Sequence, residues 1–299
     1  MILEKLINLN LYVIIFIILN LIIYFCFDYI NSIINIYDEI GDDRKIHKKR
    51  TPLLGGFIIL INTSLFLFLI NFETKFNSQF NLNLQYTIIF TMMFLLHFIL
   101  GAYDDKFDLK ASYKLFFITI IISLSIFYID IIAIKEIRLS FYDPVINLNY
   151  LSYFFSIFCY LIFLNAYNMY DGINLQNGIY AIAIFLYFIL NNIELFFSCV
   201  LILALINFLI LNYRNQTFMG DSGTMLISII VSTITIYNYN LNKIVYADEI
   251  FLLMIIPGLE IIRLFALRLI EGNSPFKPDR NHLHHLLIKE YSLIKSNAV

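Results

Sequence analysis

Long apolar segments are the feature that most constrains how this chain can fold. Hydrophobic residues make up 60% of its 299 residues and the mean hydropathy is +0.79, which is more apolar surface than one soluble core can bury. A membrane-spanning helix needs about 20 mainly apolar residues. We therefore expect an all-α, polytopic membrane bundle that occupies residues 1–299 as a single domain with about nine spans. The candidate spans are 6–36, 53–70, 86–103, 113–134, 150–167, 176–191, 194–212, 222–238 and 249–270.

The positions of Lys and Arg predict the orientation of these spans, because cytoplasmic loops carry an excess of both. With nine spans and the loop 37–52 in the cytoplasm, most basic residues fall on the cytoplasmic side. The sixth span is the doubtful one, since its apolar stretch at 179–190 is short, but omitting it removes the charge bias. We predict an outside N-terminus and a cytoplasmic C-terminus. The basic residues left outside are Lys5, Lys75, Lys135, Arg138 and Lys243.

The aromatic composition bears on the membrane interfaces. The chain has no Trp and 21 Tyr. Because Trp and Tyr are the residues that concentrate at the two membrane–water interfaces, we expect Tyr to supply the interfacial belts of this protein.

Polar residues gather in five clusters that this topology places on the cytoplasmic side. A random scatter of loop residues would not choose one face, so we predict one cytoplasmic site, built by the loops 37–52, 104–112, 168–178, 212–222 and 271–299. The clusters are DDRKIHKKRTPLLGG (42–56), GAYDDKFDLKASYK (101–114), NAYNMYDGINLQNG (165–178), FMGDSG (218–223) and PFKPDRNHLHHLL (275–287).

Four of the carboxylates in these clusters are candidates for the site: Asp104, Asp105, Asp171 and Asp221. Gathered at a membrane surface they repel one another unless a cation lies among them. Oxygen ligands without cysteine favour Mg²⁺ over zinc. The alternative for each aspartate alone is that it caps a helix N-terminus or is solvated in a loop.

Basic residues and histidines complete the predicted site. Lys45 and Lys114 are candidate phosphate contacts. Two prolines of PFKPDR precede Arg280, just before a helix expected near Asn281, which is a favourable place for phosphate. Residues 282 and 285 would share one face of that helix while 284 points elsewhere. No Cys or Glu-x-x-His partner supports zinc, so we favour imidazole hydrogen bonds to phosphate or a sugar hydroxyl; simple exposure is the alternative. The histidines are His282, His284 and His285.

A divalent cation, basic groups and a glycine-lined surface at the lipid boundary together indicate phosphoryl transfer between a soluble nucleotide donor and a lipid acceptor. The alternatives are a polytopic transporter and an inactive assembly scaffold. Transporters usually place ionisable groups near the bilayer midplane, whereas Asp28, His97 and Asp130 lie nearer to predicted helix ends. The retained aspartates argue against an inactive scaffold.

The five clusters, in this order, resemble the polyprenyl-phosphate N-acetylhexosamine-1-phosphate transferase family, of the glycosyltransferase family 4 type. The likeness extends from about residue 38 to residue 287. SPFKPDRNHLHH, at 274–285, is similar to the His-x-His-His loop of the undecaprenyl-phosphate N-acetylglucosamine-1-phosphate transferase branch. The pentapeptide-substrate branch fits this loop less well.

The resemblance implies that undecaprenyl phosphate attacks the β-phosphorus of a UDP-N-acetylhexosamine and releases UMP, which starts a lipid-linked cell-envelope glycan such as O-antigen. It implies Mg²⁺, with Mn²⁺ as a substitute, held by Asp221 and Asn168, and an acceptor phosphate beside the Asp-Asp pair. The candidate residues are Asp104, Asp105 and Asp171 as catalytic, Asp221 and Asn168 as metal ligands, and Lys45, Lys114, Asn165, Arg280, His282, His284 and His285 as substrate-binding.

The resemblance also implies a multi-pass protein of the bacterial inner membrane with a cytoplasmic active site, no nucleic-acid partner, and a homodimer by analogy. Two departures from the family pattern stand out. Asn174 replaces the second aspartate of Asp-Gly-Ile-Asp-Gly-Leu, and this sequence ends soon after the histidine loop without a further helix. The donor sugar and the glycan pathway stay open.

Overall fold

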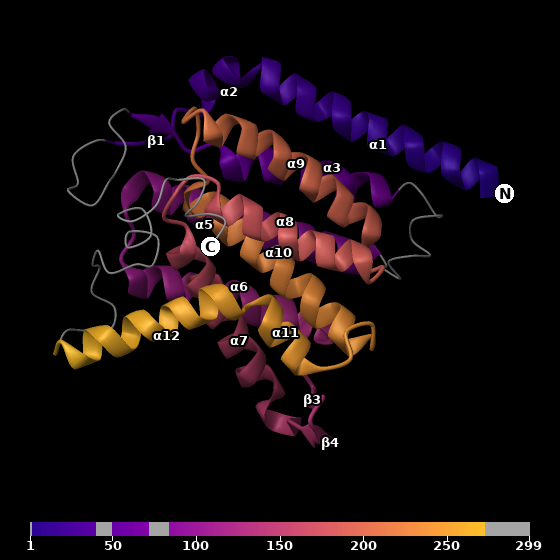
Figure 1. Cartoon of the computed structure of the whole chain (residues 1–299), viewed down its shortest axis with the longest axis vertical. Coiled ribbons are helices and arrows are strands. Elements are labelled where there is room, and N and C mark those ends of the chain that lie inside the picture. Colours follow the sequence, from indigo (N-terminus) through magenta and orange to yellow (C-terminus); the bar gives the residue numbers. More distant parts are fainter. Residues whose placement is uncertain (1, 40–49, 72–83, 273–299) are drawn as a thin grey trace.

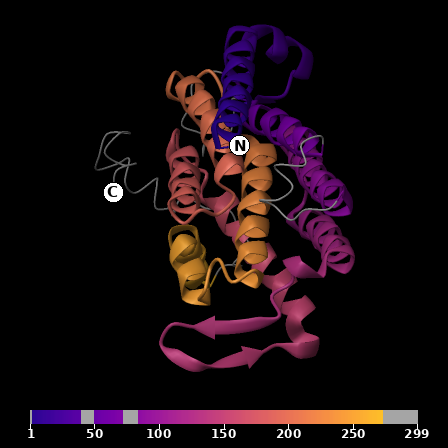
Figure 2. The same ribbon diagram turned by 90° about the vertical axis from the view of Figure 1, so that its right-hand side faces the viewer.

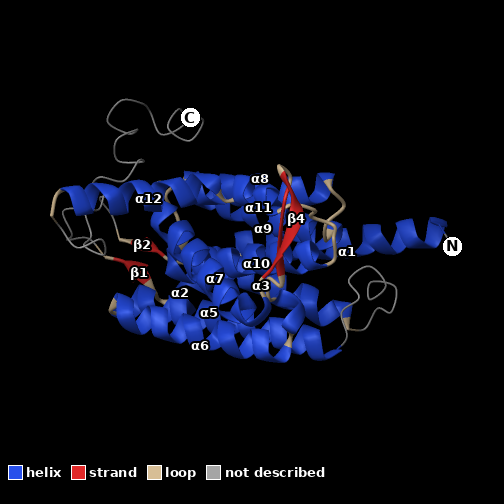
Figure 3. Cartoon of the chain, turned by 90° about the horizontal axis from the view of Figure 1, so that it is seen from below, coloured by secondary structure: helices blue, strands red, loops and turns tan. Residues whose placement is uncertain are grey.

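The computed structural model describes residues 2–39, 50–71 and 84–272, with side chains from residue 12 onward. Within these ranges the chain is mostly helical, and the helices lie side by side as a bundle (Figures 1 and 3). They are α1 (Ile2–Phe25), α2 (Phe27–Ile34), α3 (Gly55–Ile70), α5 (Leu84–Phe107), α6 (Ala111–Tyr128), α7 (Ser152–Tyr170), α8 (Gln176–Leu190), α9 (Leu195–Tyr213), α10 (Gly220–Asn240), α11 (Ala247–Leu253) and α12 (Ile255–Ile270), with 3₁₀ turns η1 (Asp130–Ile132) and η2 (Asn149–Leu151).

Among the described residues, five helices are long and apolar enough to cross a membrane: α5, α6, α7 with the preceding η2 turn, α9 and α10. The pairs α1–α2 and α11–α12 also qualify if each is one span, although they bend by 70° and 74°. Helices α3 and α8 are apolar but shorter. The protein is therefore a polytopic helical membrane protein. The count of nine spans and their orientation stay predictions.

The first apolar segment differs from the single helix expected over 6–36. It bends between α1 and α2, and the second part carries Asp28, Asn31 and Ser32. If α2 continued straight from α1, these polar side chains would lie on the same axis as the apolar helix. The bend instead gives α2 a separate direction, as in an amphipathic helix that lies at a membrane interface.

Helix α10 forms the centre of the bundle, where every residue from Ser222 to Tyr239 is buried. It packs mainly against α5, α3 and α7. Small hydroxyl residues make this central position possible, because they allow neighbouring helices to approach closely. The hydroxyls of Ser228 and Ser232 donate to the carbonyls of Thr224 and Ser228, at 2.7 Å each, so burial leaves these two groups satisfied.

Glycines permit close backbone contact where α10 begins. A Cβ atom on Gly101 of α5 would lie 2.5 Å from the Asp221 carbonyl oxygen and 2.5 Å from the Ser222 Cα. A Cβ atom on Gly56 of α3 would lie 2.5 Å from the Gly223 nitrogen. Both neighbours are backbone and cannot rotate away. The N-terminal turn of α10 is therefore held by contacts that only glycine allows.

Two small antiparallel sheets depart from the all-α expectation. Strands β1 (Tyr37–Asp38) and β2 (Thr51–Pro52) pair near the start of α10, while β3 (Glu136–Leu139) and β4 (Tyr142–Asn147) form a hairpin between α6 and α7 near its other end. Figure 2 shows this hairpin extending sideways, its strands crossing the direction of the helices. The membrane-span pattern gave no sign of strands in what it treated as an outer loop.

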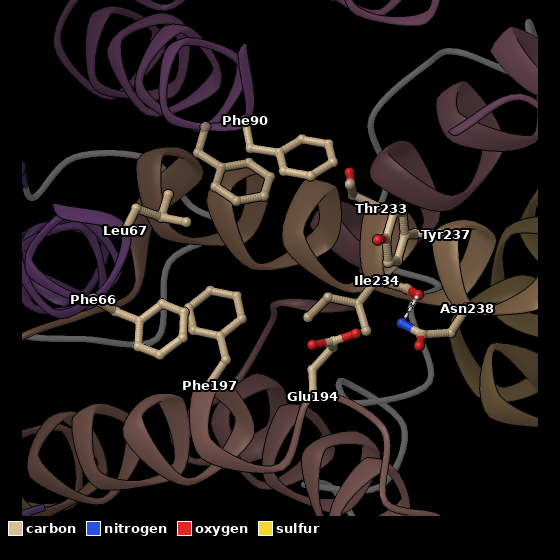
Figure 4. Close-up of a pocket in the computed structure, with 10 residues that line it drawn as sticks. Phe66, Leu67, Phe90, Glu194, Phe197, Thr233, Ile234, Tyr237 and Asn238 are labelled. Carbon is tan, nitrogen blue, oxygen red and sulfur yellow. Dashed lines mark hydrogen bonds between the residues drawn. The ribbon is translucent and has the colours of Figure 1, made fainter. Parts of the chain in front are cut away.

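A small aromatic pocket also lies toward the far end of α10, distant from Asp221 (Figure 4). Glu194 projects into it, and its carboxylate lies 3.5 Å from Lys243 Nζ. Burial raises the pKa of Glu194, and the Lys243 charge counteracts part of this increase. The pocket is thus separate from the polar clusters. Its lining residues are Phe66, Leu67, Phe90, Phe94, Glu194, Phe197, Thr233, Ile234, Tyr237 and Asn238.

We expect Gly101→Ala to lower the free energy of unfolding by about 1–3 kcal/mol, because the added methyl group meets the α10 backbone. Gly258→Ala in α12 is the matched control, since nothing lies within 4 Å of its Cβ position. Thermal unfolding of the detergent-purified protein, followed by circular dichroism, measures both. Equal melting temperatures for the two variants would contradict the close packing of α5 on α10.

Candidate active site

Four of the five polar clusters meet around the N-terminus of α10. The segment before this helix is bound to the β2–α3 segment by three backbone hydrogen bonds: Phe218 N–H donates to the Pro52 carbonyl at 2.9 Å, Gly55 N–H to Phe218 at 3.0 Å, and Gly56 N–H to Met219 at 3.2 Å. The ends of α5 and α7 and the start of α6 bring the other polar residues to the same place. The fifth cluster, with Arg280, His282, His284 and His285, lies outside the described residues, as does Lys45.

Lys114 is the centre of the site. Its ammonium lies 2.6 Å from Asp104 Oδ2 and 2.6 Å from Asp221 Oδ2. Asn168 satisfies its three neighbours when its carbonyl oxygen faces Lys114 at 2.9 Å and its amide nitrogen faces Asp221 Oδ1 at 2.8 Å and Thr224 Oγ1 at 2.9 Å; this amide orientation is assigned from the hydrogen bonds. Side chains from α5, α7 and α10 thus converge on the Lys114 ammonium of α6.

The two adjacent aspartates of α5 have different partners. Asp104 is buried, binds Lys114, and accepts the Leu109 N–H at 2.7 Å. Asp105 accepts the N–H groups of Asp221 at 2.7 Å and Ser222 at 3.0 Å, so both of its oxygens serve the first turn of α10. This is side-chain capping of a helix N-terminus from another helix. In the structure Asp105 thus holds the first turn of α10, and with it Asp221, in place; the expected contact of the pair with an acceptor phosphate stays a prediction.

Gly220 makes room for this cap. Its φ is +70°, a left-handed backbone conformation, and a Cβ atom on it would lie 2.7 Å from Asp105 Oδ2. A side chain at this position would be strained by the backbone and would also collide with the capping carboxylate. The glycine of the FMGD cluster therefore has a definite structural role.

Asp171 follows the last turn of α7, outside the spanning segment. Desolvation by burial raises its pKa to about 7; the negative charge of Asp105 adds to this effect, and the nearby Asn177 amide opposes it. The carboxyl group is therefore close to half-protonated at neutral pH. Asp171 is the predicted catalytic residue that lies outside the spans, and its protonation changes near physiological pH.

Asn165 and Asn174 make local hydrogen bonds. The Asn165 amide donates to the Leu161 carbonyl of its own helix at 2.7 Å. The Asn174 amide nitrogen donates to the Asn212 carbonyl at 2.9 Å and to Asn215 Oδ1 at 2.6 Å. An aspartate, as in the family pattern, has no N–H to donate to these acceptors. Asn174 therefore fastens the α7–α8 loop to the end of α9.

The oxygen donors around Lys114 suit a hard cation. Asp104, Asp221 and Asn168 already direct three oxygens at the Lys114 ammonium, and Mg²⁺ prefers such ligands. No three His, Cys, Asp or Glu side chains in the described part of the chain are placed to hold one ion together. A magnesium ion here would need ligands beyond the protein carboxylates, and Mg²⁺ commonly takes substrate phosphates and water. The residues present therefore fit Mg²⁺ if substrate phosphates and water complete its set of ligands.

Two features of the site were missed from the sequence. Thr224 contacts Asn168 and donates to the Asp221 carbonyl at 3.2 Å; its spacing of three residues from Asp221 was a usable signal. In α12, Arg263 makes two hydrogen bonds of 2.8 Å to Glu260, which is 4% exposed and acts electrostatically on Tyr170 beside Asp171. The opposite charges three residues apart in an apolar segment could have predicted this pair.

Together the fold and the site define a polytopic helical membrane protein with a carboxylate–lysine–amide cluster at one end of its bundle. Residues 86–239 match glycosyl transferase family 4. This matched region is more than half of the chain and includes Asp104, Lys114, Asn168 and Asp221. The protein therefore belongs to glycosyl transferase family 4, and the resemblance found in its sequence is confirmed.

Three relatives show how far the similarity extends, and each is named undecaprenyl-phosphate alpha-N-acetylglucosaminyl 1-phosphate transferase. The protein from Yersinia pestis is 25% identical over 259 residues, covering 82% of this chain and 68% of its own length. Those from Salmonella typhi and Escherichia coli strain K12 are 27% and 28% identical over 202 residues, covering 63% of this chain and 54% of theirs. The matched region thus spans about half to two thirds of these relatives.

We expect Asp105→Asn to lower the free energy of unfolding by about 1–2 kcal/mol, because one carboxylate oxygen is replaced by an NH₂ group that cannot accept an α10 N–H. Asp143→Asn on the exposed strand β4 is the control and should leave the melting temperature unchanged. Thermal unfolding in detergent compares the two. If Asp105→Asn unfolds with the wild-type midpoint, the carboxylate cap is not needed to hold α10.

The raised pKa of Asp171 predicts a pH-dependent stability. The ordinary pKa is 3.8 and that in the folded protein is about 7, so the folded state binds the proton more tightly and loses stability as the pH rises from about 4 to 7. The amide of Asp171→Asn does not titrate, so this variant does not lose stability as the pH rises. Its melting temperature should exceed that of the wild type by an amount that grows between pH 5 and pH 8. A difference that shrinks over this range would show that the carboxylate is stabilised in its charged form.

Proposed function

We propose that this protein transfers N-acetylhexosamine 1-phosphate from a UDP-sugar to undecaprenyl phosphate, releasing UMP. The observation that carries the proposal is the Lys114 ammonium bound between Asp104, Asp221 and Asn168 at one end of a membrane bundle. A lipid phosphate and a soluble nucleotide can meet only where the bilayer ends. Family membership and the names of the relatives support the same reaction.

In the proposed reaction an oxygen of the lipid phosphate forms a bond to the β-phosphorus of the donor. The bond from that phosphorus to the oxygen shared with the α-phosphate breaks, and UMP leaves with the electron pair. A phosphate monoester has a second pKa near 6 and is mostly dianionic at pH 7, so no base is required. Asp104, which binds Lys114 and Leu109, would position Lys114 beside the phosphates.

Lys114 would stabilise negative charge on the phosphoryl oxygens during transfer. Asp221 and Asn168 would hold Mg²⁺ together with donor phosphates. When bound, the ion supplies neutralisation of the pyrophosphate charge. Asp105 would act indirectly, because it keeps the first turn of α10, and hence Asp221, in place. The roles of Lys45, Arg280 and the three histidines stay predictions from the resemblance.

N-acetylglucosamine is the first donor sugar to test, because the relatives are named for it. We propose an active site on the cytoplasmic face of a bacterial inner membrane, a homodimer by analogy, and a role in starting a cell-envelope polysaccharide such as O-antigen. The predicted surplus of Lys and Arg on the cytoplasmic side supports this orientation.

A direct assay tests the reaction. Purified protein in detergent is given radiolabelled UDP-N-acetylhexosamines, undecaprenyl phosphate and Mg²⁺, and UMP release and labelled lipid are measured. We expect both products in equal amounts, loss of both with a chelator, and recovery when Mg²⁺ is restored. Lys114→Ala should lower the rate by about 10²–10³-fold, since one charged donor to the phosphates is lost.

Lys110→Ala is the matched control, because Lys110 belongs to the same polar cluster but is exposed at the N-cap of α6. It should keep close to the wild-type rate. Uptake of UDP-sugar into proteoliposomes without UMP release would instead identify a transporter and overturn the proposal.

A further inference from the structure

The β3–β4 hairpin, the η2 turn and the first turn of α7 carry an aromatic edge that no described residue covers. We define this edge as Phe141, Tyr142, Tyr150 and Phe154, which are 79%, 49%, 95% and 74% exposed. Its residues follow the end of α6 and continue into the first turn of α7, whereas Lys114 is in the first turn of α6, so the edge lies at the other end of that helix. So much aromatic surface is costly in water, so its position requires an explanation.

The hairpin is firmly attached to the bundle. The Arg138 guanidinium lies over the Tyr239 ring at 4.3 Å, and the Arg138 N–H donates to the Tyr239 hydroxyl at 2.7 Å. The Ser140 N–H donates to Asp248 at 2.8 Å, and Ser152 Oγ donates to the Ile134 carbonyl at 2.7 Å. These contacts hold the aromatic edge at a fixed height relative to α10 and α7.

The aromatic edge continues a surface that already faces lipid. Helices α6 and α7 are long and apolar enough to span the membrane, so their exposed apolar side chains would contact acyl chains. Phe127 at the end of α6 is 73% exposed and Phe158 in α7 is 59% exposed. Phe154 lies one turn before Phe158, and the hairpin connects the two helices. Exposed aromatic side chains of both helices thus adjoin the hairpin along the chain.

The length of α10 relates this surface to the site. At about 1.5 Å per residue, the 21 residues of α10 extend for about 31 Å, close to the roughly 30 Å hydrocarbon thickness of a bilayer. Tyr239, which holds Arg138, is near one end and Asp221 is at the other. If the hairpin rests at one interface, Asp221 lies at the opposite one.

We propose that the β3–β4 hairpin and η2 turn rest in the lipid headgroup layer on the side opposite the Lys114 site, with the aromatic edge against the lipid. In a chain without Trp, Phe and Tyr would supply the interfacial contacts that Trp and Tyr usually provide. The hairpin would then fix the depth of α10. The consequence for catalysis, that this depth places Asp221 at the opposite interface, rests on the proposed function. The contact of the hairpin with lipid does not.

The absence of Trp makes a fluorescence test simple, because Phe141→Trp and Tyr150→Trp each introduce the only Trp in the chain. The variants are placed in phosphatidylcholine nanodiscs whose acyl chains are brominated either near the glycerol or near the methyl end. We expect blue-shifted emission, stronger quenching by the shallow bromines than by the deep ones, and weak quenching by acrylamide. Phe158→Trp, further into α7, is the control and should be quenched relatively more by the deep bromines.

Two results would overturn the proposal. Emission like that of free N-acetyltryptophanamide, with strong acrylamide quenching, would place the edge in water. Resistance to both acrylamide and bromolipid would show that protein, such as a second copy of the chain, covers the edge. Neither result bears on UMP release, so failure here and failure of the proposed transferase reaction can be told apart.

Discussion

The N-terminus of α10 imposes the constraint on which the rest of the structure depends. The first N–H groups of a helix have no partners within it, and here the helix begins packed against α3 and α5 at one end of the bundle. Asp105 satisfies two of these groups, and glycines of α3 and α5 let the backbones come close enough. The position of Asp221 is thus decided by backbone contacts before any ligand is considered.

Placing Asp105 there brings a second carboxylate, Asp104, beside Asp221. Like charges at the edge of an apolar bundle repel one another strongly, and Lys114 offsets part of that repulsion by binding both Asp104 and Asp221. One lysine does not neutralise three carboxylates. The remaining negative charge would favour the divalent cation of the proposed reaction, and the two ion pairs fix Lys114 in position.

Most of the site could be predicted from the sequence, because loops on one side of a membrane bundle have few places to go. Asp104, Lys114 and Asp221 were named from the polar clusters and Asn168 from the family resemblance, and all four meet in the structure. What the sequence pattern missed has a common cause. Thr224, the Glu260–Arg263 pair and the hairpin depend on contacts between elements or on short strands, whereas a count of apolar residues reports only whether a segment suits a bilayer.

The sequence by itself determined that the chain is a helical membrane protein. The free energy of transferring a segment into lipid is nearly the sum of contributions from its individual residues. The sequence also determined which polar residues were available at one end. Only the tertiary structure decided what each does. Asp104 and Asp105 are identical neighbours in the sequence, but successive side chains of a helix point about 100° apart. One therefore meets a lysine of α6 and the other the backbone of α10.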